Sequence, residues 1–302
     1  MDMIGFVGLG TVGGVIARNI QQAGYPMMVR DILPEAAQPL IDRGAQPGAS
    51  AAEVAQCCRV VFTSLPGPRE VEEVALGPNG LSEGVHDRTI YVDLSSSSPD
   101  LIRRIGAHFR PRGAQVMDAP VIVGKNGVAN RSLQVLASGS LEAYATVKSL
   151  LETFGDPVVY TGELGMGTVI KLAHNLVRRG IGLAIGEGII LGAKAGVEPQ
   201  LLWDCMRWGL DVQLHQLEKT FSDTVFKGNY EAPASFGIGL SRKDVGLATE
   251  LGRQHDVPMP IPALVDQIMV QATGRAWPEQ GTASLFPLQE EAAGIKVRTQ
   301  ST

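Results

Sequence analysis

The sequence predicts an α/β fold for the first half of the chain and an all-helical fold for the second half. Two observations lead to this prediction. Up to about residue 164, short apolar segments with strand composition alternate with helical segments, which is typical of a mainly parallel sheet. Beyond that point the strand-like segments end, and only helical patterns follow.

The strand-like segments of the first half are separated by helical segments. The candidates are IGFVG (4–8), PMMVR (26–30), RVVFTSL (59–65), TIYVDLS (89–95), AQVMDAP (114–120), SLQVLAS (132–138) and PVVYTG (157–162). Helices are predicted over 13–24 and 33–44, and the later strands are expected to run in mixed directions.

The second half begins with a long helical pattern and continues with shorter ones. The predicted helices are 167–195, 199–209, 214–223, 241–256 and 262–274. This pattern divides the chain into an N-terminal sheet domain over 1–164, a connecting helix over 165–195 and an all-helical domain over 196–302.

Composition and charge are those of an ordinary globular protein. Of the 302 residues, 44% are hydrophobic and 19% charged, and the net charge of −5 is spread along the chain, so no nucleic-acid surface is expected. Cys57, Cys58 and Cys205 lack disulfide or metal-ligand spacing, which predicts free thiols and no metal site. The N-terminus shows no secretory signal, and Glu187 interrupts the longest apolar stretch, so we expect a cytoplasmic protein without a membrane span.

A glycine pattern, G-x-G-x-x-G, directly follows the first strand candidate and opens a helix. In this context the first glycine makes a tight turn, the second lets the backbone approach a pyrophosphate, and the third lets the helix pack close to the strand. The helix start then offers N–H groups to phosphate. The pattern predicts a Rossmann-type dinucleotide-binding domain whose cofactor contacts include Gly8, Leu9, Gly10, Thr11, Val12 and Gly13.

Asp31 ends the second strand candidate about 20 residues after the glycines, where this fingerprint has an acidic residue. A carboxylate there binds ribose hydroxyls and repels a 2′-phosphate, so the sequence favours NAD over NADP. The neighbouring Arg30 weakens that discrimination. FAD and S-adenosylmethionine also bind such loops, and the second half of the chain disfavours both.

Lys171 interrupts an otherwise apolar helical segment, GTVIKLAHN. Helical spacing places Thr168, Lys171, Asn175 and Arg178 on one polar face. Such a face can line a cleft, and a lysine there suits general acid/base catalysis at the hydroxyl of an alcohol that loses a hydride.

Six stretches in fixed order extend these features along the chain. They are GFVGLGTVGGVIARNIQQAGY, VFTSLPGPREVEEVALGPNGL, DLSSSSPD, MDAPVIVGKNGVA, GELGMGTVIKLAHN and SFGIGLSRKDVGLA. Together they resemble the β-hydroxyacid dehydrogenase family, whose members include 3-hydroxyisobutyrate dehydrogenases and tartronate semialdehyde reductases. The resemblance implies a fold like that of 6-phosphogluconate dehydrogenase. It also implies an NAD-dependent oxidoreductase that acts on the CH–OH group of a small 3-hydroxy acid or related alcohol.

The resemblance also implies roles for individual residues. Lys171 matches the catalytic lysine, and Asn175 matches an asparagine that contacts substrate. Further cofactor contacts implied are Leu65, Pro66, Ser95, Ser96, Phe236 and Lys243, with Asp244 close by. The expected substrate contacts are Ser96, Ile122, Val123, Gly124, Asn175 and Arg178.

One stretch departs from the family pattern, which reads D-A-P-V-S-G-G. Ile122 and Val123 stand where a serine hydroxyl and a glycine would meet the substrate carboxylate. The change removes a hydrogen-bond donor and makes the approach narrower and more apolar. We therefore expect an atypical substrate, either larger or with its anion held by Arg178, His174 or Lys125; the alternative is an ordinary specificity restored by the loop conformation.

Rival functions remain open at this point. An imine reductase shares the architecture but usually replaces the catalytic lysine, and the helical domain of a decarboxylating 6-phosphogluconate dehydrogenase is much larger. A catalytically silent NAD(H)-binding sensor is compatible with the altered substrate loop. The glycine-rich helix over 180–195, together with the resemblance, implies a homodimer or homotetramer.

Overall fold

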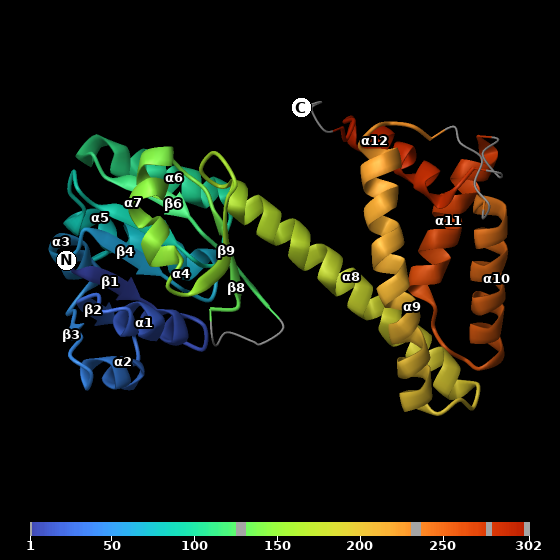
Figure 1. Cartoon of the computed structure of the whole chain (residues 1–302), viewed down its shortest axis with the longest axis horizontal. Coiled ribbons are helices and arrows are strands. Elements are labelled where there is room, and N and C mark those ends of the chain that lie inside the picture. Colours follow the sequence, from blue (N-terminus) through green and yellow to red (C-terminus); the bar gives the residue numbers. More distant parts are fainter. Residues whose placement is uncertain (1, 125–130, 231–236, 276–279, 299–302) are drawn as a thin grey trace. The chain divides into compact units, whose positions relative to one another are not determined.

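The computed structural model describes residues 2–124, 131–230, 237–275 and 280–298, and it divides the chain into two compact units, 1–177 and 178–302 (Figure 1). The division falls within helix α8, Met166–Lys194, so this helix contributes residues to both units.

A six-stranded parallel sheet lies at the centre of the first unit, with strand order β3-β2-β1-β4-β5-β6. The strands are β1 Ile4–Val7, β2 Met27–Arg30, β3 Gln46–Pro47, β4 Val60–Thr63, β5 Ile90–Asp93 and β6 Gln115–Asp118. This order confirms the predicted Rossmann-type domain, in which ligands bind outside the carboxyl ends of the strands. The sequence pattern does not predict β3, because two residues are too few to show a period.

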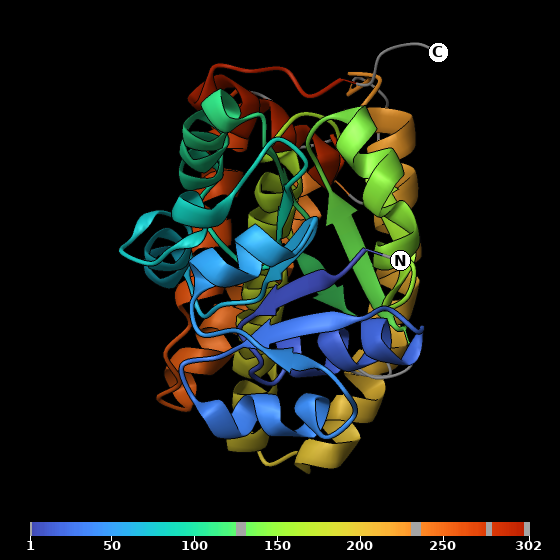
Figure 2. The same ribbon diagram turned by 90° about the vertical axis from the view of Figure 1, so that its left-hand side faces the viewer.

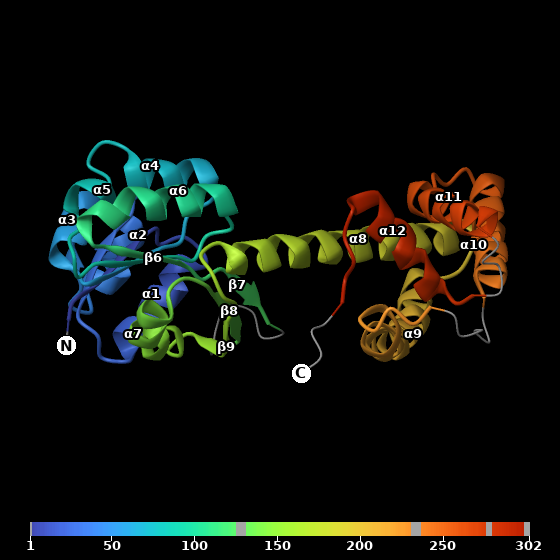
Figure 3. The same cartoon turned by 90° about the horizontal axis from the view of Figure 1, so that it is seen from above.

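Helices cover both faces of this sheet because its strands are buried on both sides. One apolar cluster joins the sheet to α1 Gly13–Gln22, α2 Pro34–Ile41 and α7 Leu141–Leu151. The other joins it to α3 Ala51–Cys57, α4 Pro68–Leu76, α5 Leu81–Gly84 and α6 Pro99–Phe109, and α6 is followed by a 3-10 turn, Arg110–Arg112. Along β4, Phe62 packs in the first cluster and Val61 in the second, as the two-residue period of a strand requires. Figure 3 shows α1 and α7 on one side of the strands and α4, α5 and α6 on the other.

A second sheet of three strands extends the first unit beyond β6. It consists of β7 Val121–Val123, β8 Leu133–Ala137 and β9 Gly155–Tyr160. β7 is antiparallel to β8, whereas β8 is parallel to β9, so the later strands run in mixed directions as expected. Backbone hydrogen bonds between Asp118 and Ser138, with N···O distances of 3.1 and 2.7 Å, join the two sheets. The strands of the first unit can also be followed in Figure 2.

The elements of the second unit within its described ranges are helices and helical turns, apart from an isolated backbone bridge between Gly237 and Gly281. Besides the end of α8 it contains α9 Pro199–Thr220, a π-helical turn Phe221–Val225, α10 Ile238–Gln254, α11 Pro260–Gly274, a 3-10 turn Thr282–Leu285 and α12 Phe286–Ala293. The separate helices predicted over 199–209 and 214–223 are one helix, because Gly209 is accommodated inside α9. Gly188 and Gly192 of α8 let α9 approach closely, since a Cβ at Gly192 would lie 2.5 Å from Leu202. Within the described residues, no helix has the length and apolar character needed to cross a membrane.

Candidate active site

The turn between β1 and α1 has a shape that only glycine permits at two positions. Gly8 has φ +92°, and a Cβ there would lie 2.4 Å from the Ser64 carbonyl oxygen. A Cβ at Gly13 would lie 2.1 Å from the Gly8 oxygen, so the helix starts in contact with the turn. Gly10 and Thr11 are exposed, and a Cβ at Gly10 would meet no atom within 4 Å. This open backbone before a helix N-terminus fits the pyrophosphate of a dinucleotide.

Asp31 follows β2 and is tied to the glycine turn. Its Oδ2 accepts a hydrogen bond from the Leu9 N–H at 2.6 Å, and its Oδ1 accepts one from the Leu33 N–H at 2.9 Å. The Arg30 guanidinium donates to the Gly48 carbonyl oxygen at 3.3 Å. Ile32 is 89% exposed, so the residue after the carboxylate presents an apolar side chain without donors. No pattern in the sequence indicates that Asp31 also orders the glycine turn, because the hydrogen bond to Leu9 joins residues 22 positions apart.

The loops after β4 and β5 are joined by a hydrogen bond from the Leu65 N–H to the Ser95 Oγ at 2.9 Å. Ser95 is buried, whereas Pro66 and Ser96 are exposed. The predicted contacts Leu65, Pro66, Ser95 and Ser96 therefore belong to one connected loop pair at the carboxyl ends of two adjacent strands. This edge also carries the glycine turn, because β1 is the neighbour of β4.

Asp93 supports this loop pair from below. It is fully buried, and its Oδ1 accepts hydrogen bonds from the Thr63 hydroxyl at 2.7 Å and from the Ser95 N–H at 3.2 Å. Its Oδ2 has no hydrogen-bond partner. Burial raises the pKa of Asp93 to about 6, and the negative charge of the neighbouring Asp118 adds to the rise. Hydrogen bonds from Ser95 and Thr63 lower the pKa but do not cancel this effect. Tyr91, whose hydroxyl lies 2.9 Å from the Thr63 Oγ1, has its pKa raised by burial and by Asp93.

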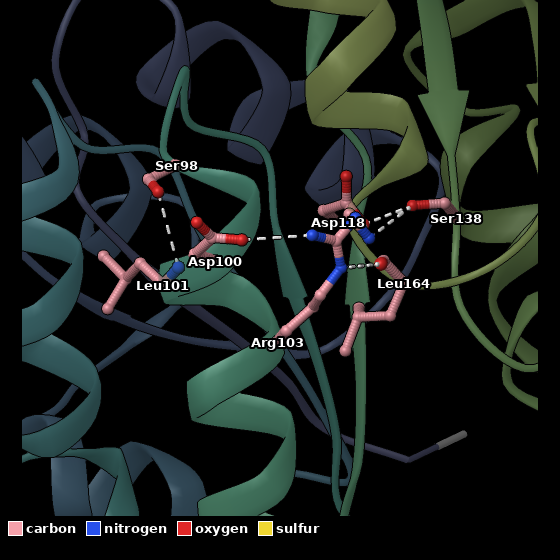
Figure 4. A network of polar contacts seen from close by, with 8 residues as sticks. Ser98, Asp100, Leu101, Arg103, Asp118, Ser138 and Leu164 are labelled. Carbon is pink, nitrogen blue, oxygen red and sulfur yellow. Dashed lines mark hydrogen bonds and ion pairs between the residues drawn. The ribbon is translucent and has the colours of Figure 1, made fainter.

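Asp118, at the end of β6, holds the start of α8 to the sheet (Figure 4). It is fully buried, and its Oδ1 accepts from the Gly165 N–H at 2.7 Å. Its Oδ2 accepts from the N–H of Thr168 at 2.7 Å and from its hydroxyl at 2.8 Å. The Ser138 hydroxyl also donates to Asp118, and its Oγ accepts from the N–H groups of Gly165 and Gly167 at 3.2 and 3.1 Å. The N–H groups in the first turn of a helix have no acceptor within the helix. Here Asp118 and Ser138 at the strand ends accept their hydrogen bonds.

Arg103 holds the segment just before α8. Its Nε donates to the Leu164 carbonyl oxygen at 3.2 Å, and its Nη1 pairs with Asp100 at 3.2 Å. Figure 4 shows this arginine reaching from α6, whose first turn is capped by Ser98. The approach to α8 is therefore fixed from two sides.

Lys171 lies one turn beyond Thr168 on α8 and is half-buried. Its Nζ donates a hydrogen bond to the Val121 carbonyl oxygen at 2.6 Å. Val121 opens β7, the strand that carries the predicted substrate loop. The predicted polar face of α8 is corrected at Thr168, which is fully buried against Asp118 and does not share a surface with Lys171.

The substrate-loop residues that depart from the family pattern lie on β7 beside Lys171. Ile122 is half-buried and pairs in register with Gln134 of β8, and Val123 is 47% exposed. Gly124 donates its N–H to the Ser132 oxygen at 2.9 Å, and a Cβ there would lie 2.4 Å from that oxygen. The loop that follows, with Lys125, lies outside the described residues.

The remaining predicted residues are spread over both units. Asn175 is half-buried on the part of α8 that belongs to the first unit. Arg178 and Lys243 belong to the second unit and are exposed there, and the Lys243 Nζ pairs with Asp244 at 3.1 Å. Lys243 lines an open groove between α10 and α11. Phe236 lies outside the described residues.

Sequence reasoning missed the buried polar residues under the site, Thr63, Asp93, Asp118 and Ser138. Asp93 and Asp118 each end a buried strand, at the same register position. A carboxylate at the end of two apolar strand candidates was the signal that could have found them, because such a group needs partners when buried.

Two protein-family models match consecutive parts of the chain. Residues 3–162 match the model described as "NAD binding domain of 6-phosphogluconate dehydrogenase". Residues 165–288 match the model described as "NAD-binding of NADP-dependent 3-hydroxyisobutyrate dehydrogenase". Together these matches cover both halves of the chain.

Curated relatives match along nearly the full chain. The 3-hydroxyisobutyrate dehydrogenase of Pseudomonas aeruginosa is 30% identical over 277 residues, which cover 87% of this chain and 90% of that protein. The 2-(hydroxymethyl)glutarate dehydrogenase of Eubacterium barkeri is 26% identical over 294 residues, 97% of each chain.

Solved structures share the fold. An imine reductase from Pseudomonas sp. has a TM-score of 0.84 at 20% identity and covers 95% of this chain and 99% of its own. The imine reductase from Myxococcus stipitatus in complex with NADP+ has a TM-score of 0.87 at 14% identity, over 95% and 99% of the two chains. At such low identity these likenesses concern the fold alone. The family matches and the relatives, on a sheet edge built for a dinucleotide, show that this chain belongs to the β-hydroxyacid dehydrogenase family of NAD(P)-dependent oxidoreductases.

Proposed function

We propose that this protein is an NAD-dependent dehydrogenase or reductase that transfers a hydride between nicotinamide and a small 3-hydroxy acid or related alcohol. One observation carries the proposal: the Lys171 Nζ is held 2.6 Å from the Val121 carbonyl oxygen. The lysine is thereby fixed on a helix that starts at the sheet edge bearing the glycine turn and the Ser95–Ser96 loop.

The residues that would hold the cofactor are those of the glycine turn, Asp31 and the loop pair of Leu65, Pro66, Ser95 and Ser96. Lys243 and Phe236 stay proposed cofactor contacts on the ground of the sequence resemblance alone. When bound, the dinucleotide supplies the hydride acceptor for oxidation or the hydride donor for reduction. The exposed backbone at Gly10 supports a close approach of its pyrophosphate.

Lys171 is proposed as the general acid/base. During oxidation its amine takes the proton from the substrate hydroxyl as the hydride leaves the neighbouring carbon, and during reduction its ammonium returns that proton to the carbonyl oxygen. The Val121 carbonyl orients the Nζ, which supports a fixed proton-transfer geometry. Asn175, one turn further along α8, is proposed to orient the substrate by hydrogen bonds, and Arg178 to hold its anion.

The direct test replaces Lys171 by alanine. Substrate-dependent NADH formation should fall by about a hundredfold or more, the scale of general acid/base catalysis, while NADH binding stays intact. Lys148→Ala is the matched control, because that lysine is exposed on α7 and its Nζ pairs with Glu152, four residues further on. A Lys171→Ala enzyme with ordinary turnover would refute the proposal.

NAD is proposed as the preferred cofactor. The Asp31 carboxylate lies beside the glycine turn, where it would repel a 2′-phosphate. Two further features support this preference. The Arg30 guanidinium is engaged by the Gly48 carbonyl, and the exposed side chain of Ile32 offers no hydrogen-bond donor.

An atypical substrate is proposed from the apolar β7 segment. Ile122 and Val123 offer no side-chain donor to a carboxylate, and Ile122 lies beside Lys171's partner Val121. We infer a substrate with more apolar bulk next to the reacting carbon than a short 3-hydroxy acid, or one whose anion is held by Arg178 or His174. The other functions considered receive less support. The retained Lys171 argues against an imine reductase, and no finding favours a catalytically silent sensor.

A homodimer or homotetramer is proposed from the second unit. Its apolar surface includes Leu183 at 65% exposure and Trp208 at 75%, and a Cβ at Gly182 or Gly186 would meet no atom within 4 Å. Exposed apolar patches of this kind are typical of protein interfaces. Light scattering on the full chain should give a multiple of 32.1 kDa; a monomer at micromolar concentration would contradict the proposal.

A further inference from the structure

The Asp118 carboxylate uses its full hydrogen-bonding capacity on the start of α8 and on Ser138. It accepts from the Gly165 N–H, from the N–H and hydroxyl of Thr168 and from the Ser138 hydroxyl. A carboxylate offers about four acceptor positions, so none is left over. A negative charge at this place also complements the positive end of the helix dipole.

The first turn of α8 lies close to the sheet. A Cβ at Gly167 would lie 2.1 Å from the Leu136 oxygen and 3.1 Å from the Asp118 Oδ2. The helix start therefore has no room to move towards the sheet, and the hydrogen bonds to Asp118 and Ser138 prevent it from moving away.

Two hydrogen bonds, each reaching between α8 and the strand region, connect Asp118 to the Lys171 amine through short stretches of chain. Thr168, which Asp118 binds, stands three residues before Lys171, and Val121, which accepts from the Lys171 Nζ, stands three residues after Asp118. A shift of α8 by about 1 Å would stretch the Nζ–oxygen contact beyond hydrogen-bonding range. Misplacement of a reacting group by that amount costs about a hundredfold in rate.

We propose that Asp118 is the positioning residue for Lys171: its carboxylate fixes the first turn of α8 so that the lysine amine meets the substrate hydroxyl. Ser138 assists, because its Oγ accepts a hydrogen bond from the Gly167 N–H. The inference rests on the proposed function, in which Lys171 is the general acid/base. Asp118 itself is fully buried and acts through Lys171, without touching substrate or cofactor.

The test is a double-mutant cycle on the full-length enzyme with Asp118→Asn and Lys171→Ala. An asparagine offers one acceptor oxygen and turns an NH2 group towards N–H donors, so the helix start should lose its fixed position. Asp118→Asn should lower kcat by about a hundredfold with the NADH Kd within about twofold of wild type. In the double variant kcat should equal that of Lys171→Ala, because the amine that Asp118 positions is then absent.

The outcomes separate the inference from the proposed function. If Asp118→Asn keeps an ordinary kcat, or if its loss multiplies with that of Lys171→Ala, the positioning role is refuted. If Lys171→Ala itself keeps an ordinary kcat, the proposed function fails instead. Glu198→Gln is the matched control, since it changes a carboxylate cap to an amide at the start of α9 and should leave kcat unchanged.

A milder variant covers the case in which Asp118→Asn does not fold. Thr168→Val removes only the hydroxyl donor to Asp118 and keeps the N–H bond. It should lower kcat by about tenfold without weakening NADH binding, and this loss too should vanish in the Lys171→Ala background. An ordinary kcat for a folded Thr168→Val enzyme, or a loss that persists without the lysine, would overturn the inference.

Discussion

Asp93 and Asp118 lie side by side in register at the carboxyl ends of β5 and β6, and both are fully buried. Their surroundings differ. Asp118 accepts hydrogen bonds from the start of α8 through both carboxylate oxygens. Asp93 accepts hydrogen bonds from Thr63 and Ser95 through its Oδ1, whereas its Oδ2 has no hydrogen-bond partner. The pair therefore divides into a carboxylate that anchors a helix and a carboxyl group whose pKa is raised by burial.

The first prediction concerns the pH dependence of stability at Asp93. Burial raises its folded pKa from 3.8 to about 6. The protonated form is therefore favoured by folding, and this contribution is fully present below pH 3.8 and is lost as the pH rises through 6. The shift corresponds to about 3 kcal/mol. Tyr91 on the same strand and Asp118 on the next are the titratable groups that interact with it.

Asp93→Asn should remove this dependence, because an amide stays neutral throughout. Thermal unfolding from pH 4 to pH 8 should show the midpoint of the variant rising relative to wild type as the pH increases. Asp100→Asn is the control, since that carboxylate is exposed at the start of α6 and its curve should follow wild type. Parallel curves for wild type and Asp93→Asn would contradict the prediction.

The glycine turn predicts a contrast between two alanine variants. A Cβ at Gly13 would meet the Gly8 oxygen at 2.1 Å, so Gly13→Ala should lower both the unfolding temperature and NADH affinity. A Cβ at Gly10 would meet nothing within 4 Å, so Gly10→Ala should keep the unfolding temperature and weaken NADH binding by about tenfold or more, because the methyl group stands where the backbone approaches the pyrophosphate. Calorimetry and NADH fluorescence titration measure the two effects. Unchanged binding in Gly10→Ala would rule out this location for the cofactor.

Cofactor preference should respond to the charge at Asp31. Asp31→Asn keeps an oxygen for the Leu9 N–H and removes the charge that opposes a 2′-phosphate. The ratio of kcat/KM for NADP to that for NAD should rise by about tenfold. Asp42→Asn, an exposed carboxylate at the end of α2, serves as the control for net charge. If the ratio does not move, the carboxylate does not set the preference.

Substrate range should respond to Ile122. Ile122→Ser adds a hydroxyl donor on β7, and a hydrogen bond to a charged carboxylate contributes about 1.5–3 kcal/mol. Steady-state kcat/KM for 3-hydroxyisobutyrate or D-glycerate should therefore rise by about tenfold or more. Simple alcohols without a carboxylate provide the control and should show no comparable gain. An ordinary wild-type rate on these short acids would show instead that the loop conformation compensates for the missing serine.

Local patterns along the chain were sufficient for the sheet domain and much of its site. The strand–glycine–helix pattern led to the turn at Gly8 and Gly13, and the acid at Asp31 was found from its separation from that turn. Helical phasing assigned Lys171 to a polar face. Each of these inferences depends on residues close in sequence, where the periods of helix and strand are reliable.

The sequence by itself determined the α/β class, the dinucleotide turn and the identity of Lys171 as the reactive candidate. Only the tertiary structure decided what each polar side chain meets. Thr168 shares a helical face with Lys171 by phasing, yet it is buried against Asp118, fifty residues earlier. The Val121 carbonyl that holds the Lys171 amine is equally distant in sequence. Strand register and helix docking bring these groups together through long-range packing. The periods of helix and strand show which face a side chain occupies, but they do not specify which distant residue it contacts.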